Sequence, residues 1–496
     1  MSKIAESAAR VTHLALRERY HCLIGGSLVG TESGKTFPAI NPATGEKLAE
    51  VPDCDSRDID RAVQSAQKAF AAWRRMSPAE RGNYCRRFAE RLRARKEVYA
   101  ALDALDCGNP LSMMRVDVEI AAAQLDYFAG LAPEIKGETI PSISQTFSFT
   151  LREPFGVVGR IIPFNHPILF AASRIAAPLV AGNTIVLKPA EQTSLSALEM
   201  AYDAKEIFPP GVVNIVSGDG PKAGAALVRH PAVRRIAFTG SAEVGREIMR
   251  ASADGLKTIS LELGGKNPMI VFPDADLERA VISAFHGMNY TWCQGQSCGS
   301  TSRLFLHADV HHAFLERLVD RLKGIRMGLP IDEKTEMGCL ASQQQFEKVM
   351  SYIEHGKKEG ARLVSGGGKP SNPVLQRGFF VEPTVFDQVD YRMRLAQEEI
   401  FGPVQSVLLW KDPNELVQMA NSVMYGLTAS IWTRDFPTAY RIASEIEAGY
   451  VWINDSSKHF LGAPFGGYKQ SGLGREECLS ELLSYTQIKS VNMNVE

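Results

Sequence analysis

The residues from Val157 to Glu262 decide the fold, because short apolar runs alternate there with glycine-rich turns and helical stretches. One unit of this pattern is RRIAFTGSAEVGREIMRA, residues 234–251, in which an apolar run leads through Thr239-Gly240-Ser241 into a helical stretch. Repeated units of this kind are typical of a parallel sheet that carries helices on both faces. The sequence therefore predicts an α/β fold.

The same pattern sets the expected elements on either side of this unit. Short strands are expected at 23–24 and 37–40, and Ser56 is expected to cap a helix. The apolar residues of that helix recur at helical spacing, at Ile59, Val63, Ala66, Phe70 and Trp73. Further strands are predicted at 157–162, 184–187, 212–216 and 235–239, and further helices at 168–181, 194–207 and 242–251.

Length and composition predict several domains and are compatible with an enzyme. A chain of 496 residues is too long for one ordinary core, which predicts two or more domains. The net charge of −1 gives no indication of nucleic acid or of an anionic membrane surface as a partner. The most apolar stretch, 168–187, is interrupted by Arg174, Pro178 and Asn183, which indicates a buried helix and strand rather than a membrane span.

The cysteines and the N-terminus indicate a reducing compartment. The eight cysteines have no framework spacing, and no nearby His or Cys completes a metal site around Cys293 and Cys298. Residues 1–6 lack the apolar core of a secretory signal. We therefore expect a cytoplasmic protein without a metal ion.

Two turns of the α/β region carry candidate ligand chemistry. Residues 238–245, FTGSAEVG, place glycines where a strand leads into a helix, and amides exposed there suit a phosphate or pyrophosphate. A packing role for Gly240 and Gly245 is the alternative. Residues 188–191, KPAE, follow another strand of the sheet, at the edge where such sheets bind ligands. Lys188 and Glu191 are therefore either ligand contacts, with Glu191 accepting ribose hydroxyls, or a solvated ion pair.

A cysteine and a glutamate on glycine-rich turns indicate covalent catalysis. Cys298 lies in GQSCGS, residues 295–300, thirty-six residues after Glu262 in ELGGK, residues 262–266. A thiolate can attack an electrophilic carbon, and a carboxylate can later activate the water that cleaves the adduct. Taken alone, a cysteine is more often a small buried apolar residue, so the assignment depends on the motifs around it.

Ordered motifs across about three hundred residues give the chain a family resemblance. It resembles the aldehyde dehydrogenase superfamily along nearly all of its length. The matching runs are PFNHP (163–167), KPAE (188–191), FTGS (238–241), ELGGK (262–266), GQSC (295–298), EIFGP (399–403) and PFGG (464–467).

The resemblance implies a nucleotide-binding Rossmann-like domain, an α/β catalytic domain and a small β arm for oligomerisation. The nucleotide-binding domain is expected at 1–131 and 151–263, and the catalytic domain at 264–477. The arm is expected to combine a hairpin in 132–150 with the C-terminal strand in 478–496, where apolar residues alternate with polar ones. An edge strand of this kind needs a partner, so we expect a homodimer or a homotetramer.

The resemblance also implies a mechanism. Cys298 would attack the aldehyde carbon to give a thiohemiacetal, whose oxyanion accepts from Asn165 and from the Cys298 backbone N–H. Hydride transfer would leave a thioester, and Glu262 would activate the water that hydrolyses it. Because members that transfer the acyl group to coenzyme A generally lack this glutamate, Glu262 favours a free carboxylic acid as product. A silent structural member is disfavoured, since the nucleophile and the glutamate are both present.

NAD is the cofactor that the matched motifs imply. Glu191 against the adenosine ribose would repel a 2′-phosphate, which favours NAD, although Lys188 leaves NADP possible. Glu399 resembles the residue that binds the nicotinamide ribose, and Phe401 the ring that flanks the nicotinamide. The expected cofactor residues are Ile162, Pro163, Phe164, Lys188, Glu191, Phe238, Gly240, Ser241, Val244, Leu263, Glu399 and Phe401.

The substrate follows from the expected channel to Cys298. Its predicted residues are Phe170, Trp292, Ser297, His459, Phe460 and Phe465. Ring walls suit an apolar or aromatic aldehyde, whereas Trp292 also suits betaine aldehyde or aminoaldehydes by cation–π contact. We expect no Arg beside these positions, which disfavours a semialdehyde with a second carboxylate, although Lys458 or His459 could approach the mouth. Many members place an aromatic residue where this chain has His166, which is either structural or in contact with the channel.

Overall fold

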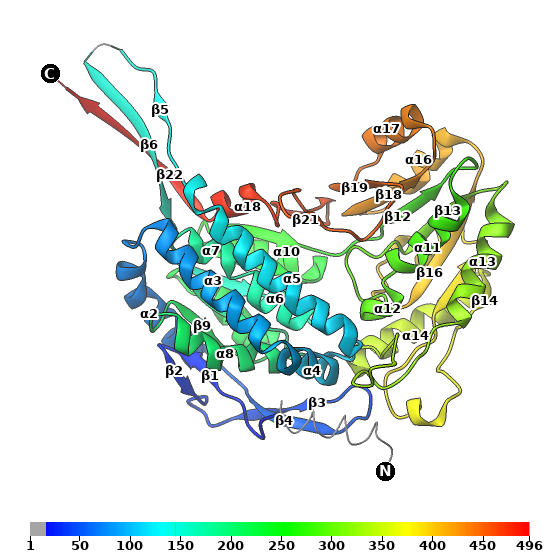
Figure 1. Cartoon of the computed structure of the whole chain (residues 1–496), viewed down its shortest axis with the longest axis horizontal. Coiled ribbons are helices and arrows are strands. Elements are labelled where there is room, and N and C mark those ends of the chain that lie inside the picture. Colours follow the sequence, from blue (N-terminus) through cyan, green and yellow to red (C-terminus); the bar gives the residue numbers. More distant parts are fainter. Residues whose placement is uncertain (1–15, 144, 496) are drawn as a thin grey trace.

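A mostly parallel sheet forms the centre of the first lobe of the molecule (Figure 1). The computed structural model describes residues 16–143 and 145–495, so residues 1–15, where we expect no secretory signal, lie outside the described residues. The strand order is β2-β1-β9-β8-β7-β10-β11-β21, with β1 and β21 antiparallel to their inner neighbours. The strands are β1 (Cys22–Ile24), β2 (Ser27–Val29), β7 (Val157–Ile161), β8 (Thr184–Lys188), β9 (Val213–Ile215), β10 (Val233–Thr239), β11 (Thr258–Glu262) and β21 (Gly472–Leu473).

Helices cover both faces of this sheet, as the sequence predicts. Neighbouring residues of a strand, such as Ile185 and Val186, belong to two different cores because successive side chains point to opposite faces. The first core contains residues of α3 (Pro78–Ala94), α4 (Lys96–Cys107), α5 (Leu111–Gly130), α6 (Pro167–Ser173), α7 (Ala176–Val180) and α8 (Leu195–Ile207). The second contains residues of α2 (Ser56–Trp73), α9 (Ala225–Arg229) and α10 (Ala242–Ala253).

Two local predictions in this lobe are wrong. The predicted helix 168–181 is divided into α6 and α7, which meet at Arg174. Pro178 has no N–H to donate to the Arg174 carbonyl, so a continuous helix cannot pass this point. The cap of α2 is Asp55 rather than Ser56, since the Asp55 carboxylate accepts from Arg57 N and Asp58 completes a capping box.

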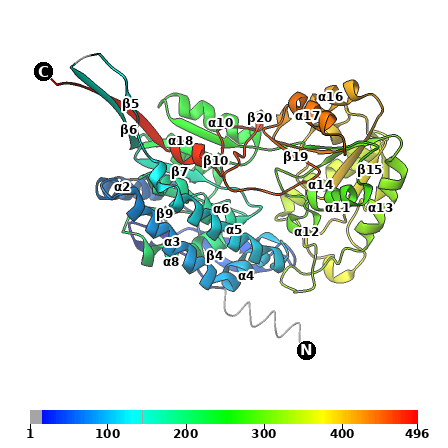
Figure 2. The same ribbon diagram turned by 45° about the horizontal axis from the view of Figure 1, so that its top comes forward.

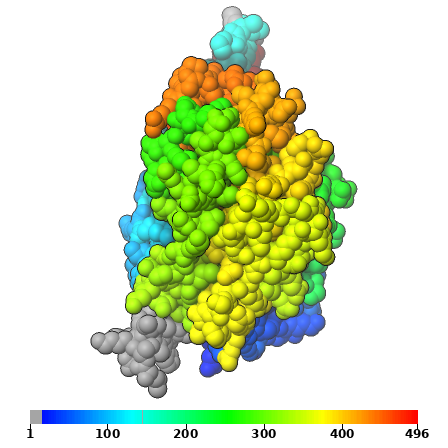
Figure 3. Space-filling model, turned by 90° about the vertical axis from the view of Figure 1, so that its right-hand side faces the viewer, coloured from blue at the N-terminus to red at the C-terminus, as the bar shows by residue number. Residues whose placement is uncertain are grey.

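The second lobe is built on another mixed sheet. Its strand order is β14-β15-β16-β13-β12-β18-β19, parallel except for β14. The strands are β12 (Pro268–Val271), β13 (Arg303–His307), β14 (Arg362–Ser365), β15 (Thr384–Asp387), β16 (Val404–Trp410), β18 (Thr428–Trp432) and β19 (Tyr450–Ile453). The helices are α11 (Leu277–Gly287), α12 (Tyr290–Cys293), α13 (His311–Lys323), α14 (Gln343–Lys358), α15 (Arg394–Gln397), α16 (Pro413–Asn421) and α17 (Phe436–Glu445). Figure 3 shows this lobe in space-filling form, with its segments from green to orange facing the viewer.

A narrow β arm extends from the first lobe, away from both sheets (Figure 2). It consists of β5 (Thr139–Ile140), β6 (Thr146–Pro154) and β22 (Thr486–Asn494), and β22 pairs antiparallel with the whole of β6. Its exposed apolar residues include Phe147, Leu151 and Ile488. The short helix α18 (Leu479–Ser484) precedes β22 and packs Leu482 into the first core.

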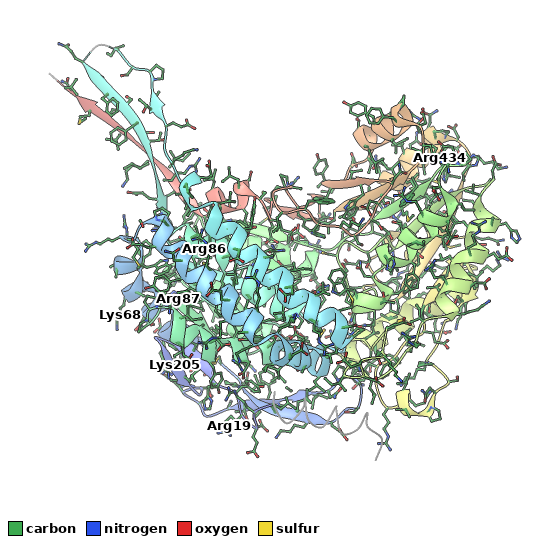
Figure 4. All side chains as sticks on the ribbon, viewed as in Figure 1. Arg19, Lys68, Arg86, Arg87, Lys205 and Arg434 are labelled. Atoms are coloured by element: carbon green, nitrogen blue, oxygen red, sulfur yellow. The ribbon has the colours of Figure 1, made fainter. Side chains whose placement is uncertain are left out.

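Shorter elements connect these parts. They are the hairpin of β3 (Thr36–Ile40) and β4 (Lys47–Pro52), the pair of β17 (Tyr425–Gly426) and β20 (Tyr468–Lys469), and the helical turns η1 (Ala132–Glu134), η2 (Gly220–Gly224) and η3 (Pro373–Leu375). In the described part of the chain, no helix is both long and apolar enough to cross a membrane. Basic side chains such as Lys68, Arg87 and Lys205 in the first lobe and Arg434 in the second lie at the periphery (Figure 4).

Candidate active site

A cavity of about 700 Å³ lies between the carboxyl ends of the first sheet and the second lobe. It is lined by every residue that the sequence assigns to catalysis, and by every residue that it assigns to the cofactor. These are Cys298, Glu262 and Asn165, together with Ile162, Pro163, Phe164, Lys188, Glu191, Phe238, Gly240, Ser241, Val244, Leu263, Glu399 and Phe401. Residues separated by more than two hundred positions in the chain therefore share one cavity.

The loop that carries Cys298 is held by two asparagines. Asn165 Nδ2 donates a hydrogen bond of 2.8 Å to the Gln296 carbonyl, and Asn267 Nδ2 donates one of 2.7 Å to the Cys298 carbonyl. The loop starts at Gly295, with φ of +72°, where a side chain would collide with the Gly402 carbonyl. The backbone of the loop is therefore fixed, while the Cys298 residue as a whole is half-buried.

The Cys298 thiol faces an environment that favours its protonated form. Burial raises the pKa of the Cys298 thiol well above its ordinary value, and the Glu262 and Glu399 carboxylates raise it further. The Arg174 guanidinium acts in the opposite direction. A nucleophilic thiolate at this position therefore becomes more abundant as the pH rises.

Glu262 ends β11 and is almost fully buried. Burial raises the pKa of its carboxyl well above the ordinary value, the neighbouring Glu476 raises it further, and Arg174 lowers it. Among the described residues, Glu262 Oε1 has no hydrogen-bond partner, and the same is true of Asn165 Oδ1. Two buried polar atoms that lack partners, in the cavity that Cys298 also lines, are what a site for water or substrate requires.

Glu262 lies near a buried cluster of arginine and glutamate side chains that the sequence did not predict. Arg160 pairs with Glu476 at 2.8 Å, while Arg174 pairs with Glu476 at 3.1 Å and with Glu477 at 3.3 Å. Glu477 also accepts from His459 Nδ1 at 2.9 Å. Arg174 could have indicated this cluster, because a charged residue within the most apolar stretch of the chain needs a buried partner of opposite charge.

The expectation that no Arg lies beside the predicted channel is wrong. The Arg174 guanidinium lies 5.2 Å from the centre of the Phe170 ring. The arginine nevertheless offers little free charge to a substrate, because Glu476 and Glu477 already neutralise it. Lys458 pairs with Asp455 at 2.9 Å and is largely exposed.

The far end of the cavity suits a nucleotide. Ser241 caps α10 by accepting a hydrogen bond from Val244 N, and Gly240 lies against the Phe238 ring where a side chain would collide. Lys188 is buried and donates to the Pro189 carbonyl at 3.0 Å, and its Nζ lies 3.6 Å from Glu191. Burial lowers the pKa of Lys188, and Glu191 opposes that shift. The pair is therefore not a fully solvated one.

Glu399 reaches this cavity from the second lobe. Its Oε1 accepts a hydrogen bond of 2.9 Å from Gly265 N. Gly264 has no side chain, and a Cβ added there would collide with the Glu399 carboxylate. The glycines of ELGGK therefore allow the carboxylate to approach the backbone beside Cys298.

The cavity is also lined by residues that the sequence analysis did not predict. They include Gly220, Pro221, Gly224, Val228 and Arg229 from the segment after β9, and Gln345 and Lys348 from α14. The run SGDG, residues 217–220, directly follows a predicted strand and was the available signal for the first group.

The predicted channel residues are not all brought to this cavity. Phe170 lines it, and Ser297 lines a small neighbouring pocket that also contains Glu399 and Phe401. Trp292 lies on α12, ahead of the Cys298 loop, and does not line the cavity. His459 and Phe465 have ring centres 4.5 Å apart, and Phe460 is exposed, but none of the three lines the cavity.

His166 is buried beside these rings. Its Nδ1 lies 2.8 Å from Asp117 Oδ2, and its ring makes edge-on contacts with Phe170 and Trp292, with centres 5.9 Å apart in each case. The sequence left two alternatives for His166, and the contact with Phe170 places its ring against a residue of the cavity wall.

Comparisons with known proteins agree with this arrangement. The model of the aldehyde dehydrogenase family matches residues 28–491. Aldehyde dehydrogenase tropH from Talaromyces stipitatus is 48% identical over 92% of this chain and 90% of its own length. Retinaldehyde dehydrogenase 3 from Mus musculus is 45% identical over 94% of this chain and 91% of its own. The NAD⁺ complex of aldehyde dehydrogenase from Bacillus cereus has a TM-score of 0.94 and 43% identity, and 98% of each chain is covered.

The α/β fold and the cavity define a class of oxidoreductases, and this chain belongs to the aldehyde dehydrogenase family. The family resemblance and the fold class that the sequence predicts are confirmed.

Proposed function

We propose that this protein oxidises an aldehyde to its carboxylic acid with NAD, through a covalent intermediate on Cys298. The observation that carries the proposal is the presence of Cys298, Asn165 and Glu262 in the cavity that also contains the predicted nucleotide residues. A nucleophile, a donor for an oxyanion and a base for water then lie within one site.

The cavity fits a dinucleotide. Its volume of about 700 Å³ is within the range of natural ligand sites. The N-terminus of α10 offers backbone amides to a pyrophosphate, and Glu191 and Glu399 are carboxylates that can accept ribose hydroxyls. When bound, NAD supplies the acceptor for the hydride. NADP is less favoured, because Glu191 would repel a 2′-phosphate.

The protein's own residues account for the covalent steps. The Cys298 thiolate attacks the aldehyde carbon, and the oxygen of the resulting thiohemiacetal accepts from the Asn165 amide and from the Cys298 backbone N–H. Asn165 Nδ2 has two N–H groups, so it can keep its bond to Gln296 and still donate to an oxyanion. After oxidation has produced a thioester, Glu262 takes a proton from the attacking water, and the acid is released as Cys298 leaves.

Hydrolysis is favoured over acyl transfer to coenzyme A. Glu262 supports this choice, since its Oε1 has no partner among the described residues and remains available to a water molecule. A coenzyme A-acylating enzyme and a silent structural protein are the weaker alternatives, because Glu262 and Cys298 are both present in the site.

An apolar or aromatic aldehyde is the proposed substrate. Phe170 lines the cavity, and the ring of His166 contacts both Phe170 and Trp292. A relative named for retinaldehyde, a large apolar aldehyde, agrees with this class. Betaine aldehyde or an aminoaldehyde is the second candidate, since an exposed face of Trp292 would suit a cation. A semialdehyde is disfavoured because Glu476 and Glu477 occupy Arg174.

We also retain proposals on architecture and location. The division into a nucleotide-binding part (1–131 and 151–263), a catalytic part (264–477) and an arm (132–150 and 478–496) is supported by the two lobes and by the pairing of β6 with β22. The exposed apolar residues of the arm support a homodimer or homotetramer. We propose a cytoplasmic location.

Initial rates with a panel of aldehydes test the function. Benzaldehyde, hexanal, betaine aldehyde and succinate semialdehyde are each supplied with NAD or NADP, without coenzyme A. We expect NADH and free acid in equal amounts, with the highest kcat/KM for benzaldehyde or hexanal. The highest kcat/KM for succinate semialdehyde would contradict the substrate class, and a strict requirement for coenzyme A would contradict the hydrolytic route.

A further inference from the structure

The Asp117 carboxylate joins two rings near Cys298. Its Oδ2 lies 2.8 Å from His166 Nδ1, and its Oδ1 accepts a hydrogen bond of 2.9 Å from Trp292 Nε1. The three residues come from different segments: Asp117 is within α5, His166 directly precedes α6, and Trp292 is within α12. One carboxylate therefore links α5, the start of α6 and α12, the helix that precedes the Cys298 loop in the chain.

The rings held by Asp117 pack in a row behind Phe170, a residue that lines the cavity. His166 contacts Phe170 on one side and Trp292 on the other, with interplanar angles of 87° and 84°. Phe170 lines the cavity that contains Cys298, and Trp292 lies six residues before Cys298. Edge-on packing of this kind restricts each ring to one orientation.

Asp117 also determines the polarity of this wall of rings. Its side chain is fully buried, and each of its oxygens has a ring partner. The Trp292 N–H points towards the carboxylate, and so does one nitrogen of His166. Because Asp117 holds the Trp292 N–H and His166 Nδ1, mainly ring carbon atoms remain to contact a substrate.

The charges of this wall balance. Burial lowers the pKa of His166, but the Asp117 carboxylate outweighs it, and the Cys293 thiol adds to the increase, so the pKa lies well above its ordinary value. The buried Asp103 on α4 is a further carboxyl near the ring. His166 and Asp117 therefore compensate each other within the wall, which leaves little charge to attract an ionic substrate.

We propose that Asp117 is a positioning residue that fixes His166 and Trp292 as a wall of rings without net charge for the aldehyde. The inference rests on the proposed function and deepens it: this wall selects neutral aldehydes with a ring or alkyl group over aldehydes with a charged tail. Asp117 itself does not touch the reacting atoms.

Asp117→Asn tests this role with little change of shape. The asparagine amide replaces one of the two acceptor oxygens with an N–H donor, so both contacts can persist only if the His166 nitrogen turns from a donor into an acceptor. Asp126→Asn is the matched control, because Asp126 lies on the same helix and forms an exposed ion pair with Arg93 at 2.7 Å. Trp292→Phe is the second variant, since it keeps a ring and removes the N–H that Asp117 holds.

The kinetic result expected is a selective loss of aldehyde binding. Asp117→Asn should raise the KM for benzaldehyde about tenfold, with kcat changed less than about twofold and the KM for NAD unchanged. The discrimination between benzaldehyde and betaine aldehyde should decrease. When Trp292 is already replaced by Phe, Asp117→Asn should raise the KM for benzaldehyde by a smaller factor than it does in the wild type. The reason is that the hydrogen bond from Trp292 to Asp117 is already absent. An unchanged KM for benzaldehyde, or a KM for NAD raised to the same extent, would overturn the proposal.

Trp292 supplies a measurement that needs no turnover. The difference between the fluorescence of the wild type and that of Trp292→Phe gives the emission of Trp292. In Asp117→Asn this emission should shift to longer wavelength and be quenched more readily by acrylamide, whereas Asp126→Asn should leave it unchanged. Unchanged emission in an active Asp117→Asn enzyme would overturn the positioning role of Asp117 but not the proposed function. Failure of the wild type to oxidise any aldehyde would overturn the proposed function, and the selectivity with it.

Discussion

Asn165 donates its side-chain N–H to the carbonyl of Gln296, two residues before Cys298, at 2.8 Å. The amide is therefore held against the loop of Cys298, the proposed nucleophile, before any substrate is present. We expect Asn165→Ala to lower kcat by about 10²–10³, the typical cost of losing one oxyanion donor. Binding of NAD, followed by fluorescence titration, should change less than about threefold. A variant with kcat near that of the wild type would contradict the role of Asn165.

Replacement of Glu262 separates the two halves of the reaction. In Glu262→Gln the thioester should form at close to the normal rate but hydrolyse slowly, because the amide cannot take a proton from water. A stopped-flow trace should then show a rapid burst of NADH, followed by turnover at least about a hundredfold slower than in the wild type. Equal losses in the burst and in the steady state would assign Glu262 to the first half instead.

The raised pKa of Glu262 predicts how the rate depends on pH. Burial and the charge of Glu476 keep this carboxyl protonated at pH values where an exposed glutamate is ionised. Because only the ionised form is a base, kcat limited by hydrolysis should rise with pH through the raised pKa and then level off. A profile of kcat between about pH 6 and pH 9 tests this, with Glu262→Gln as the control that loses the rise. A flat wild-type profile would contradict the assignment.

Glu191 should set the choice of cofactor. We expect kcat/KM to favour NAD over NADP by at least about tenfold, which corresponds to roughly 1.4 kcal/mol. Glu191→Ala should reduce the ratio, because the charge that repels a 2′-phosphate is removed, and the Glu191 partner Lys188 is released. Glu243→Ala, an exposed change in the first turn of α10, should leave the ratio unaltered. A wild-type preference for NADP would overturn the argument.

Glu477 should make the fold sensitive to acid. Burial raises the pKa of its carboxyl, but His459 and Arg174 outweigh burial and lower it to about 2. A depressed pKa contributes stability that is fully present above the ordinary value of about 4.5 and is lost as the pH falls towards 2. Glu477→Gln should cost about 3 kcal/mol or more at neutral pH, since it leaves Arg174 and His459 with less counter-charge.

Thermal unfolding between about pH 3 and pH 7 measures this dependence. The difference in Tm between the wild type and Glu477→Gln should shrink as the pH falls. Glu445→Gln is a suitable comparison, because Glu445 pairs with Arg441 only at the surface and should change Tm little. A constant difference across the pH range would show that the charge of Glu477 is not what stabilises the fold.

The sequence predicted those parts of the site that depend on local patterns. Apolar runs and glycine turns located β7, β8 and β10, and the parallel arrangement of these strands brings Asn165, Glu191 and Gly240 to one edge of the sheet. The resemblance of EIFGP to a family motif gave Glu399 and Phe401 in the second lobe as well, and the missing side chain at Gly264 leaves room for the Glu399 carboxylate.

Contacts between distant segments escaped prediction. The pairs of Arg174 with Glu476 and Glu477 join positions about three hundred residues apart, and no periodicity within either segment reveals the partner. The contacts of Asp117 with His166 and Trp292 likewise depend on how α5, α6 and α12 pack. Pro178 could have indicated the break between α6 and α7 at Arg174. The apolar character of the stretch favoured the prediction of a continuous helix instead.

Intact-mass and peptide analysis of a trapped intermediate tests the central claim most directly. Glu262→Gln is mixed with NAD and benzaldehyde, quenched in acid within the burst, and digested. The account predicts an added benzoyl group on the peptide that contains Cys298, with none on the peptides of the other seven cysteines among the eight of the chain. Omission of NAD, or replacement of Cys298 by Ala, should abolish the adduct. NADH formed in the burst without an acyl group on Cys298, or with the group on another residue, would contradict the account.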